Sequence, residues 1–514
     1  MKSAILNFRA FLVVALFVAA SVFCVYCYMY SRASGLVLGI LCILICGALS
    51  GIFIFRFVRN RSRLVVAISF SLATVLCTTA FALGVTFADS WERGYRFDGY
   101  CSVSGRVCDI DTQKGQYRLF LDDLILNGQH ANGILRVNIT VEDNNIADYV
   151  RLGDKLRFGA KLAAVRLAEK GGRINGSAYR TNLRYTAYAS SDGIVISSGD
   201  TGLSERFCAW LKNQLTENMD EKYGNIAYSM LTGDKHGLNG NVFAYYSAAA
   251  LGHIMAVSGL HIGFFVLLLN FILCKVSKKV RYPIIAAVLF AYAALVGFSP
   301  SVVRAVIMAY ISGIGILIGG RRDLLSSLLC AFSLILGVKP FYLFEVGFLL
   351  SFGAIFGIAV FAGIIRRFLV KRSAPKKIGD AIGGSLSAVL GITPANVYFF
   401  GNISILAFLV NMFILPYISV VFISLMCFLP ISAIPGCGPI LIVCKYLLIP
   451  LDYAAYGIAH IPFFTVALNT AWPVFLCYPV MFTAGEHVML GKSKTAVSWY
   501  SMAVCVVILL VCAL

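Results

Sequence analysis

Charged residues are scarce in this sequence. They form 13% of its 514 residues, about half the share of a typical soluble domain, whereas hydrophobic residues form 59%. This composition excludes an ordinary soluble protein and predicts a chain surrounded mostly by lipid or by other membrane helices. Acidic residues are the scarcer sign: 24 Asp and Glu against 43 Lys and Arg leave a formal net charge of +19. Because Lys and Arg collect in the cytoplasmic loops of membrane proteins, topology explains most of this excess, and an anionic partner is the alternative for the remainder.

Several catalytic and metal-binding signatures are also missing. The sequence has no paired CxxC array, no His/Cys spacing typical of a metal site and no GxxxxGK[ST] phosphate-binding loop. Most of its 16 cysteines lie within apolar runs, where they behave as small hydrophobic side chains. We therefore predict no metal, no cofactor and no ATP-hydrolysing site in this chain.

Long apolar runs fill most of the sequence, and each approaches the length of about 20 residues that spans a bilayer. Three runs lie at residues 11–30, 35–55 and 64–87. Residues 379–390 are apolar but short and rich in glycine, so a re-entrant segment is one alternative there. The pattern predicts a polytopic α-helical membrane protein with further spans at 251–274, 283–296, 302–318, 324–338, 345–365, 403–429, 440–460, 472–490 and 496–514.

The placement of basic residues gives the topology of these spans. Basic clusters at 275–281, 321–322 and 366–377 are each separated by two spans, so all three fall on one side of the membrane. That side is the cytoplasmic one. The turn between the second and third runs is also basic, with Arg56, Arg59, Arg61 and Arg63, and is expected on the cytoplasmic side. The third span therefore leads the region 90–198 outside the cytoplasm.

Residues 90–198 have a different texture from the rest of the chain. Short alternating stretches separated by Gly, Asn and Asp predict a small β-barrel of the OB type. The second half is basic with interleaved tyrosines, a pattern typical of single-strand binding, although a solvated basic face is an equal alternative. The DNA-binding candidates are Arg151, Lys155, Arg157, Lys161, Arg166, Arg173, Tyr179, Arg180, Arg184 and Tyr185.

Four domains follow from these patterns. Residues 1–88 form three N-terminal transmembrane helices, and 90–198 form the extracytoplasmic barrel. Residues 203–223 read as an amphipathic helix along the membrane surface. Residues 224–514 form the main transmembrane domain.

The segment LGHIMAVSGLHIG at 251–263 does not look like lipid-facing sequence. His253 and His261 are eight residues apart, so on a regular helix they lie within about 80° of each other. A metal-binding pair is one reading. Separate hydrogen bonds to neighbouring helices or to a wet cavity are favoured, because no carboxylate or third ligand is nearby in the sequence.

Five sequence blocks together resemble the ComEC family of competence proteins. In order they are LTGDKHGL, GHIMAVSGLHIG, GFSPSVVRAVIM, EVGFLLSFGAIFGI and NMFILP, all between residues 231 and 416. The His-Ser-Gly-Leu-His block is the most specific of them. The resemblance implies a multi-pass channel of the bacterial inner membrane that carries one DNA strand into the cytoplasm during natural transformation.

The resemblance also implies partners. Many family members continue into a metallo-β-lactamase-like domain, but this sequence ends at Leu514 and its six histidines form no HxHxDH cluster. We therefore expect no nuclease activity in this chain, with single-stranded DNA and membrane lipid as direct partners. A separate DNA receptor, a nuclease and a cytosolic helicase-like motor are further partners by family analogy.

Arg304 is the best candidate for a cation in the translocation path, because it lies within an otherwise apolar span after Pro300. A structural ion pair with Glu345 or Asp452 is an equal alternative. The candidate channel-lining residues are His253, Ser258, His261, Arg304, Asn396, Asn402 and Asn411.

Two competing functions remain open. A transporter of another anionic substrate would share this architecture but would not need the barrel to bind DNA. A membrane-bound enzyme using His253, His261 and Asp234 is a weaker hypothesis, because Asp234 precedes the span and would have to fold back toward the histidines.

Overall fold

The computed structural model describes residues 2–57, 64–113, 116–139, 150, 153–167, 175–189, 194–197, 203–235, 237–255, 257–296, 298–317, 324–372, 375–404, 407–461 and 465–467. The spans expected at 472–490 and 496–514 lie outside the described residues, as do Arg151 and Arg173.

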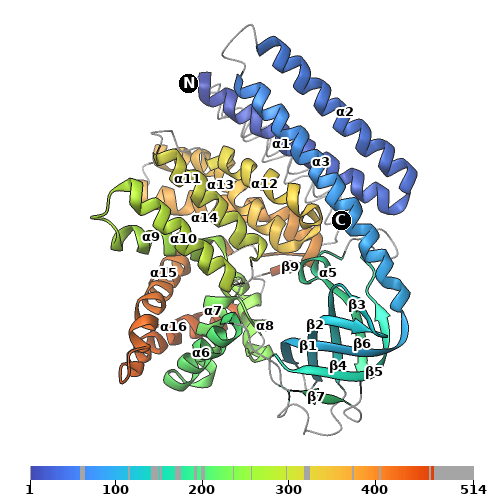
Figure 1. Ribbon diagram of the computed structural model, residues 1–514. Helices are drawn as coiled ribbons and strands as arrows, with labels where there is room; N and C mark the ends of the chain where they lie inside the picture. The colour runs from blue at the N-terminus through green and yellow to red at the C-terminus, as the bar shows by residue number, and fades with distance from the viewer. Residues whose placement is uncertain are drawn as a thin grey trace.

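Three N-terminal helices pack side by side along one edge of the molecule (Figure 1). They are α1 (Lys2–Tyr30), α2 (Arg32–Phe57) and α3 (Leu64–Arg93). Small residues permit close approach: Gly39 of α2 lies against the ring of Phe81, and Gly84 of α3 lies against Val25. The third helix continues past its apolar part and leads through the short helix η2 (Gly94–Phe97) into a β-domain.

The β-domain is a closed five-stranded barrel, as the sequence predicted. Its order is β1-β2-β4-β6-β5, and β5 pairs back with β1. All neighbours are antiparallel except β4 and β6, which gives the Greek-key topology of an OB barrel. The strands are β1 (Gly99–Gln113), β2 (Gln116–Leu126), β3 (Gln129–Ala131), β4 (Ile134–Ile139), β5 (Lys155–Ala164), β6 (Leu183–Ala189) and β7 (Val195–Ser197), with α5 (Gly176–Thr181) before β6.

Alternation along the strands fills the barrel. On β5, Leu156, Phe158, Ala160 and Leu162 are buried while the residues between them face out. Two register shifts in β1 bend this long strand so that it can pair with β5 along its first half and with β2 along its second.

The remaining helices are together called the membrane core. In chain order they are α6 (Leu203–Asn218), α7 (Glu221–Thr232), α8 (Gly240–Ala248), η3 (Gly252–Met255), α9 (Gly259–Ile272), α10 (Lys278–Leu295), α11 (Pro300–Leu317), α12 (Leu324–Val338), η4 (Pro340–Phe344), α13 (Val346–Lys371), α14 (Lys376–Phe400), α15 (Ala407–Ser432), η5 (Gly438–Leu441) and α16 (Ile442–Ala459). Two short strands, β8 (Asn402–Ser404) and β9 (Thr465–Ala467), pair with each other.

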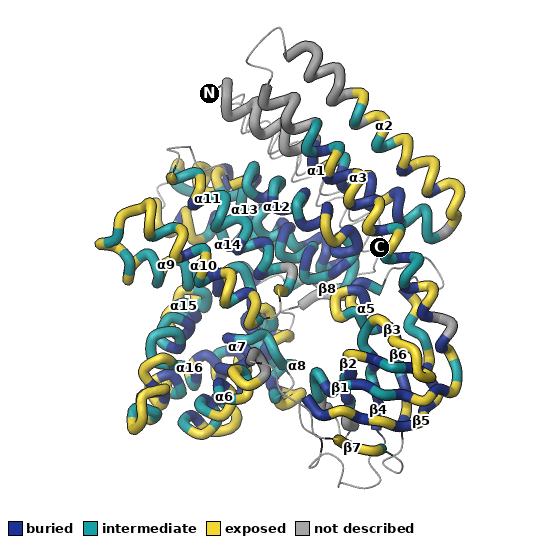
Figure 2. The backbone as a smooth tube through the Cα atoms, in the orientation of Figure 1, coloured by how far each residue is buried: buried dark blue, intermediate teal, exposed yellow. Residues whose placement is uncertain are grey.

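Five helices among the described residues are long and apolar enough to cross a membrane. They are Ser71–Arg93, Val346–Lys371, Lys376–Phe400, Ala407–Ser432 and Gly438–Ala459, and shorter apolar helices accompany them. Apolar residues between Leu36 and Ile45 of α2 are exposed, and Figure 2 draws much of this part of the helix in yellow, which suits lipid-facing sequence. The fold is therefore that of a polytopic helical membrane protein with an inserted small barrel.

The glycine-rich segment after residue 379 is a correction to the sequence analysis. It is not re-entrant but belongs to α14, a continuous helix of 25 residues. This helix lies so close to α13 that a Cβ added at Gly357 would overlap the backbone oxygen of Ser387, and one at Gly391 would overlap that of Gly353. Here glycine permits helix contact rather than breaking the helix.

The barrel is joined to the membrane core by α5 and by the end of α3. Tyr179 of α5 packs against Phe341 and Tyr342 of η4, with ring centroids 5.1 and 5.6 Å apart. Gly176 lies directly against the backbone of Phe344. On the other side, the Arg184 guanidinium covers the ring of Trp91 and its Nη1 donates a 2.8 Å hydrogen bond to the carbonyl of Ser90.

Candidate functional site

The histidine-containing segment is not one continuous helix but a short 3-10 turn followed by the start of α9. After α8, Ala250 adopts a positive φ of 60°, and the chain makes the single 3-10 turn η3. Ser258 is in an extended conformation, and α9 begins only at Gly259. The expected continuous helix across 251–274 is therefore wrong, since the polar block lies at the N-terminal boundary of α9 and not within a span.

His261 helps to form this helix start. The backbone N–H of Ser258 donates a 3.0 Å hydrogen bond to His261 Nδ1, and the Ser258 hydroxyl lies 3.4 Å from the same nitrogen. A nitrogen that accepts from a backbone N–H carries no proton, so the proton of the neutral ring is on Nε2. The ring is 2% exposed and stacks on Phe422 of α15 at 4.7 Å.

Replacing His261 with leucine is expected to destabilise the start of α9, because the Ser258 N–H would lose its acceptor. The loss should be about 1 kcal/mol, as for other helix caps. His261→Gln places an acceptor at the same third helical position and should retain most of this stability. Thermal unfolding of the detergent-purified protein measures both variants, and equal melting temperatures would argue against the cap.

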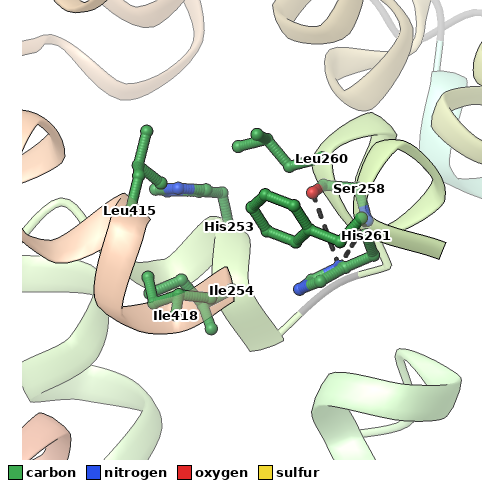
Figure 3. Close-up of a pocket in the computed structure, with 8 residues that line it drawn as sticks. His253, Ile254, Ser258, Leu260, His261, Leu415 and Ile418 are labelled. Carbon is green, nitrogen blue, oxygen red and sulfur yellow. Dashed lines mark hydrogen bonds between the residues drawn. The ribbon is translucent and has the colours of Figure 1, made fainter. Parts of the chain in front are cut away.

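His253 and His261 line one small pocket. The pocket is partly open, and Figure 3 shows it between η3, the start of α9, and Leu415 and Ile418 of α15. His253 Nδ1 lies 3.1 Å from the carbonyl of Ala250 and must donate to it, so its Nε2 is an acceptor. The two imidazoles thus present opposite hydrogen-bonding characters. Among the described residues no group of three metal-ligating side chains accompanies them.

Arg304 also contacts the start of α9, at Gly259. Its side chain, on α11, is 4% exposed, and Nε donates a 2.8 Å hydrogen bond to Ser351 on α13. The guanidinium lies 5.7 Å from the centre of the Phe352 ring and directly against Gly259, where a Cβ would overlap Nη2. Among the ion pairs found within the described part of the chain, none includes Arg304.

The two carboxylates considered as partners of Arg304 are engaged elsewhere. Glu345 caps α13 by accepting a 2.6 Å hydrogen bond from the N–H of Phe348, and Arg180 approaches it at 3.7 Å. Asp452 forms a 2.5 Å ion pair with Lys222 and accepts a hydrogen bond from the Tyr245 hydroxyl. The structural ion pair that the sequence left open is therefore not formed, and the buried cation lacks a nearby counter-charge in the described structure.

The three asparagines are placed differently. Asn411 lies on α15 one helical turn before the pocket residue Leu415, and its Oδ1 is buried without a hydrogen-bond partner. Asn396 is half-buried on α14, and no hydrogen bond within the described residues ties it to the pocket. Asn402 pairs through its backbone with Ala467. A lining role for all three asparagines stays a prediction.

The barrel candidates divide into two groups. Lys155, Arg157 and Lys161 alternate along the exposed outer face of β5, and Arg166 is exposed just after it. Tyr185, in contrast, is 1% exposed inside the barrel core.

Tyr179 and Arg184 are buried in the joint with the membrane core, and Arg180 is partly exposed there beside Glu345. Tyr179, Arg184 and Tyr185 are buried, so none of them presents a ring or a charge to solvent, which contact with DNA requires. A DNA-binding role for these three residues stays a prediction.

Two residues near the site were missed by the sequence analysis. Ser351 orients Arg304, and the available signal was a hydroxyl within the apolar block EVGFLLSFGAIFGI. Lys235, from the block LTGDKHGL, lies at the barrel joint with its ammonium 4.3 Å from the Phe243 ring centre. Burial, and secondarily the neighbouring Arg180, lower the pKa of Lys235. Positive charge therefore gathers where the barrel meets the core.

The geometry defines the class of the molecule, a multi-pass membrane protein with an inserted barrel and a buried cation at a broken helix. The model of the family described as "Competence protein" matches residues 230–491, just over half of the chain. The chain belongs to the competence protein family.

A curated relative is ComE operon protein 3 of Bacillus subtilis (strain 168), which is 30% identical over 194 residues. The match covers 37% of this chain and 24% of that protein, so the aligned part spans about a quarter of the relative. No solved structure matches the chain.

Proposed function

We propose that the protein is a channel of the bacterial inner membrane that carries single-stranded DNA into the cytoplasm during natural transformation. The observation that carries the proposal is Arg304, a buried cation packed on the first turn of α9 without a carboxylate among the ion pairs described. The family and the relative named for the ComE operon support a role in competence.

The electrostatics of this site favour a passing anion. A helix N-terminus carries about half a positive charge, and the guanidinium adds a full one at the same place. An arginine within a membrane span costs about 2.5–3.5 kcal/mol unless it is compensated. A phosphodiester group supplies the missing negative charge and forms charge-assisted hydrogen bonds with guanidinium. Because a phosphodiester chain cannot enter hydrocarbon, the channel must provide such a path.

The chain acts in this proposal as a conduit rather than as an enzyme. In this proposal, energy for pulling the strand comes from a separate cytosolic helicase-like motor. A DNA receptor and a nuclease that removes the other strand are separate partners. Their identity follows from family analogy.

A transporter of another anionic substrate is the second candidate, because the same Arg304 site attracts any anion. The outer face of β5, with Lys155, Arg157 and Lys161 exposed outside the membrane core, favours a long polyanion over a small one. A small anion would leave that face without a role.

The test is deletion of the gene in its host, restoration with the wild-type chain, and measurement of labelled DNA in the nuclease-protected cytoplasmic pool. We expect the deletion to lower this pool to background and the restored chain to recover it. DNA bound at the cell surface is the matched control and should change little. Normal protected uptake in a competent deletion strain would contradict the channel and favour the anion transporter.

A further inference from the structure

Two strongly exposed tyrosines lie on the outer face of the barrel. Tyr100 on β1 is 79% exposed and Tyr188 on β6 is 75% exposed. A single exposed ring is ordinary on a protein surface, but two exposed rings close together can form an apolar surface for a partner.

The strand register places both tyrosines beside one lysine. Lys161 of β5 pairs with Tyr100 on one side and with Tyr188 on the other. Because neighbouring strands are about 4.8 Å apart, the two tyrosine backbones lie about 10 Å apart with Lys161 between them. All three residues alternate outward from the barrel core. They form one continuous surface, which we call the tyrosine–lysine face.

Gly159 shapes this face. A Cβ at Gly159 would lie 2.6 Å from the Tyr100 hydroxyl oxygen and 3.2 Å from Cζ, so the Tyr100 ring rests over the glycine. The ring thus leans across β5, between Arg157 and Lys161, with its other surface open to solvent. Covering a strand glycine explains the position of Tyr100, but Tyr188 has no such role.

The charge of the surface is positive. Lys155 and Arg157 continue the outer side of β5 beyond Lys161. The carboxylate of Asp122 is paired with Arg106 at 2.8 Å, and Asp98 accepts a hydrogen bond from the N–H of Ala164 at the end of the strand. A row of cations with open rings beside it matches a polymer that carries phosphates and unpaired bases.

The barrel uses a different part of its surface to dock. In OB barrels the connection between the fourth and fifth barrel strands commonly contributes to nucleic-acid binding. In this barrel those two strands are β5 and β6, because β3 is not part of the barrel. The connection between them contains α5, which is packed against η4 of the membrane core. The tyrosine–lysine face, formed by β1, β5 and β6, stays open.

We propose that the tyrosine–lysine face binds single-stranded nucleic acid, with bases stacked on Tyr100 and Tyr188 and the intervening phosphate on Lys161. Arg157 and Lys155 hold the next phosphates along β5. This inference rests on the proposed function, since it names where the transported strand first meets the barrel. Stacking and phosphate contacts are largely indifferent to sequence, which suits a protein that takes up any DNA.

The test measures binding of a fluorescent oligothymidylate to the full-length protein in lipid nanodiscs by anisotropy. Tyr100→Leu and Tyr188→Leu keep an apolar side chain but remove the ring, and each is expected to weaken binding about tenfold. Tyr100→Phe and Tyr188→Phe keep the ring and should bind like wild type. Lys161→Gln should weaken binding and reduce the salt dependence by about 0.7 in the log–log slope, as for one single-strand phosphate contact.

A duplex of equal length distinguishes stacking from charge. Its bases are paired, so the leucine variants should change duplex binding little, whereas Lys161→Gln should weaken it. Unchanged oligothymidylate binding in both leucine variants would overturn the proposal and leave the rings as contacts to lipid headgroups, where tyrosine is also common. If the two leucine variants lost equal affinity for single strand and for duplex, base stacking on the tyrosines would also be overturned.

This experiment is separate from the uptake assay. Failure of the channel function would appear as normal DNA uptake after gene deletion, whatever the purified protein binds. Failure of the tyrosine–lysine face would appear in the binding curves of the leucine variants while the deletion still abolished uptake.

Discussion

Replacing Arg304 with methionine is expected to slow DNA uptake strongly while leaving the protein at least as stable as the wild type. Methionine matches much of the apolar length of arginine but removes a buried charge that no carboxylate in the described structure offsets. The cost of that charge, about 2.5–3.5 kcal/mol, would no longer oppose folding. If passing phosphates recover a similar energy, its loss corresponds to about 100-fold slower entry of DNA. Protected uptake and the melting temperature in detergent measure the two effects.

The matched control is Lys222→Met, which removes a cation that does have a buried partner. Lys222 forms a 2.5 Å ion pair with Asp452, so its loss leaves a buried carboxylate held by Tyr245 alone. Breaking such a pair destabilises a protein, so the melting temperature should fall, opposite in sign to Arg304→Met. A stable Arg304→Met protein with normal uptake would show that the cation is not in the path. A strongly destabilised one would show that it has a structural counter-charge.

The membrane architecture was readable from the sequence because apolar length and basic loops report directly on burial in lipid. The exception is the glycine-rich segment that begins at residue 379. Its sequence did not predict a continuous helix, because glycine disfavours an isolated helix. In α14 the same glycines reduce the distance to α13, and packing against a neighbour outweighs the local preference. Sequence alone does not show which neighbour a glycine faces.

Of the candidate site, the sequence indicated Arg304 but not its surroundings. Arg304 stands out because a charge in an apolar run has no local explanation, and its isolation from Glu345 and Asp452 became visible only in three dimensions. The break before Gly259 was hidden because apolar residues flank it and because His261 is not among the usual capping residues.

The barrel shows a second limit. Tyr185 and Tyr188 are three apart on one strand, so they face opposite sides, but only the register reveals which of them is inside. The sequence pattern therefore indicated basic residues and tyrosines in this region but did not distinguish the exposed ring of Tyr188 from the buried ring of Tyr185. Tyr100 lies about 60 residues before Lys161 in sequence and becomes its neighbour only when the barrel closes.

Substituting alanine for Gly357 or Gly391 is expected to separate α13 from α14 and to disrupt both folding and uptake. Each new Cβ would overlap a backbone oxygen, which cannot move without shifting its helix, so the loss should be about 3 kcal/mol or more. Gly363→Ala on α13 and Gly384→Ala on α14 are matched controls, because nothing lies within 4 Å of a Cβ at either position. These controls should be neutral or up to about 1 kcal/mol more stable, since alanine is the better helix former.

The position of the tight contact adds a functional expectation. Gly353, whose oxygen meets Gly391, is two residues after Ser351 and one after Phe352, the residues that hold the Arg304 guanidinium. A shift of α13 at this level must therefore move the cation away from the first turn of α9. We expect Gly391→Ala to lower uptake even at temperatures where the protein is still folded, whereas Gly384→Ala should leave uptake unchanged. Equal melting temperatures and equal uptake for these two variants would mean that α13 and α14 are not in close contact in the membrane.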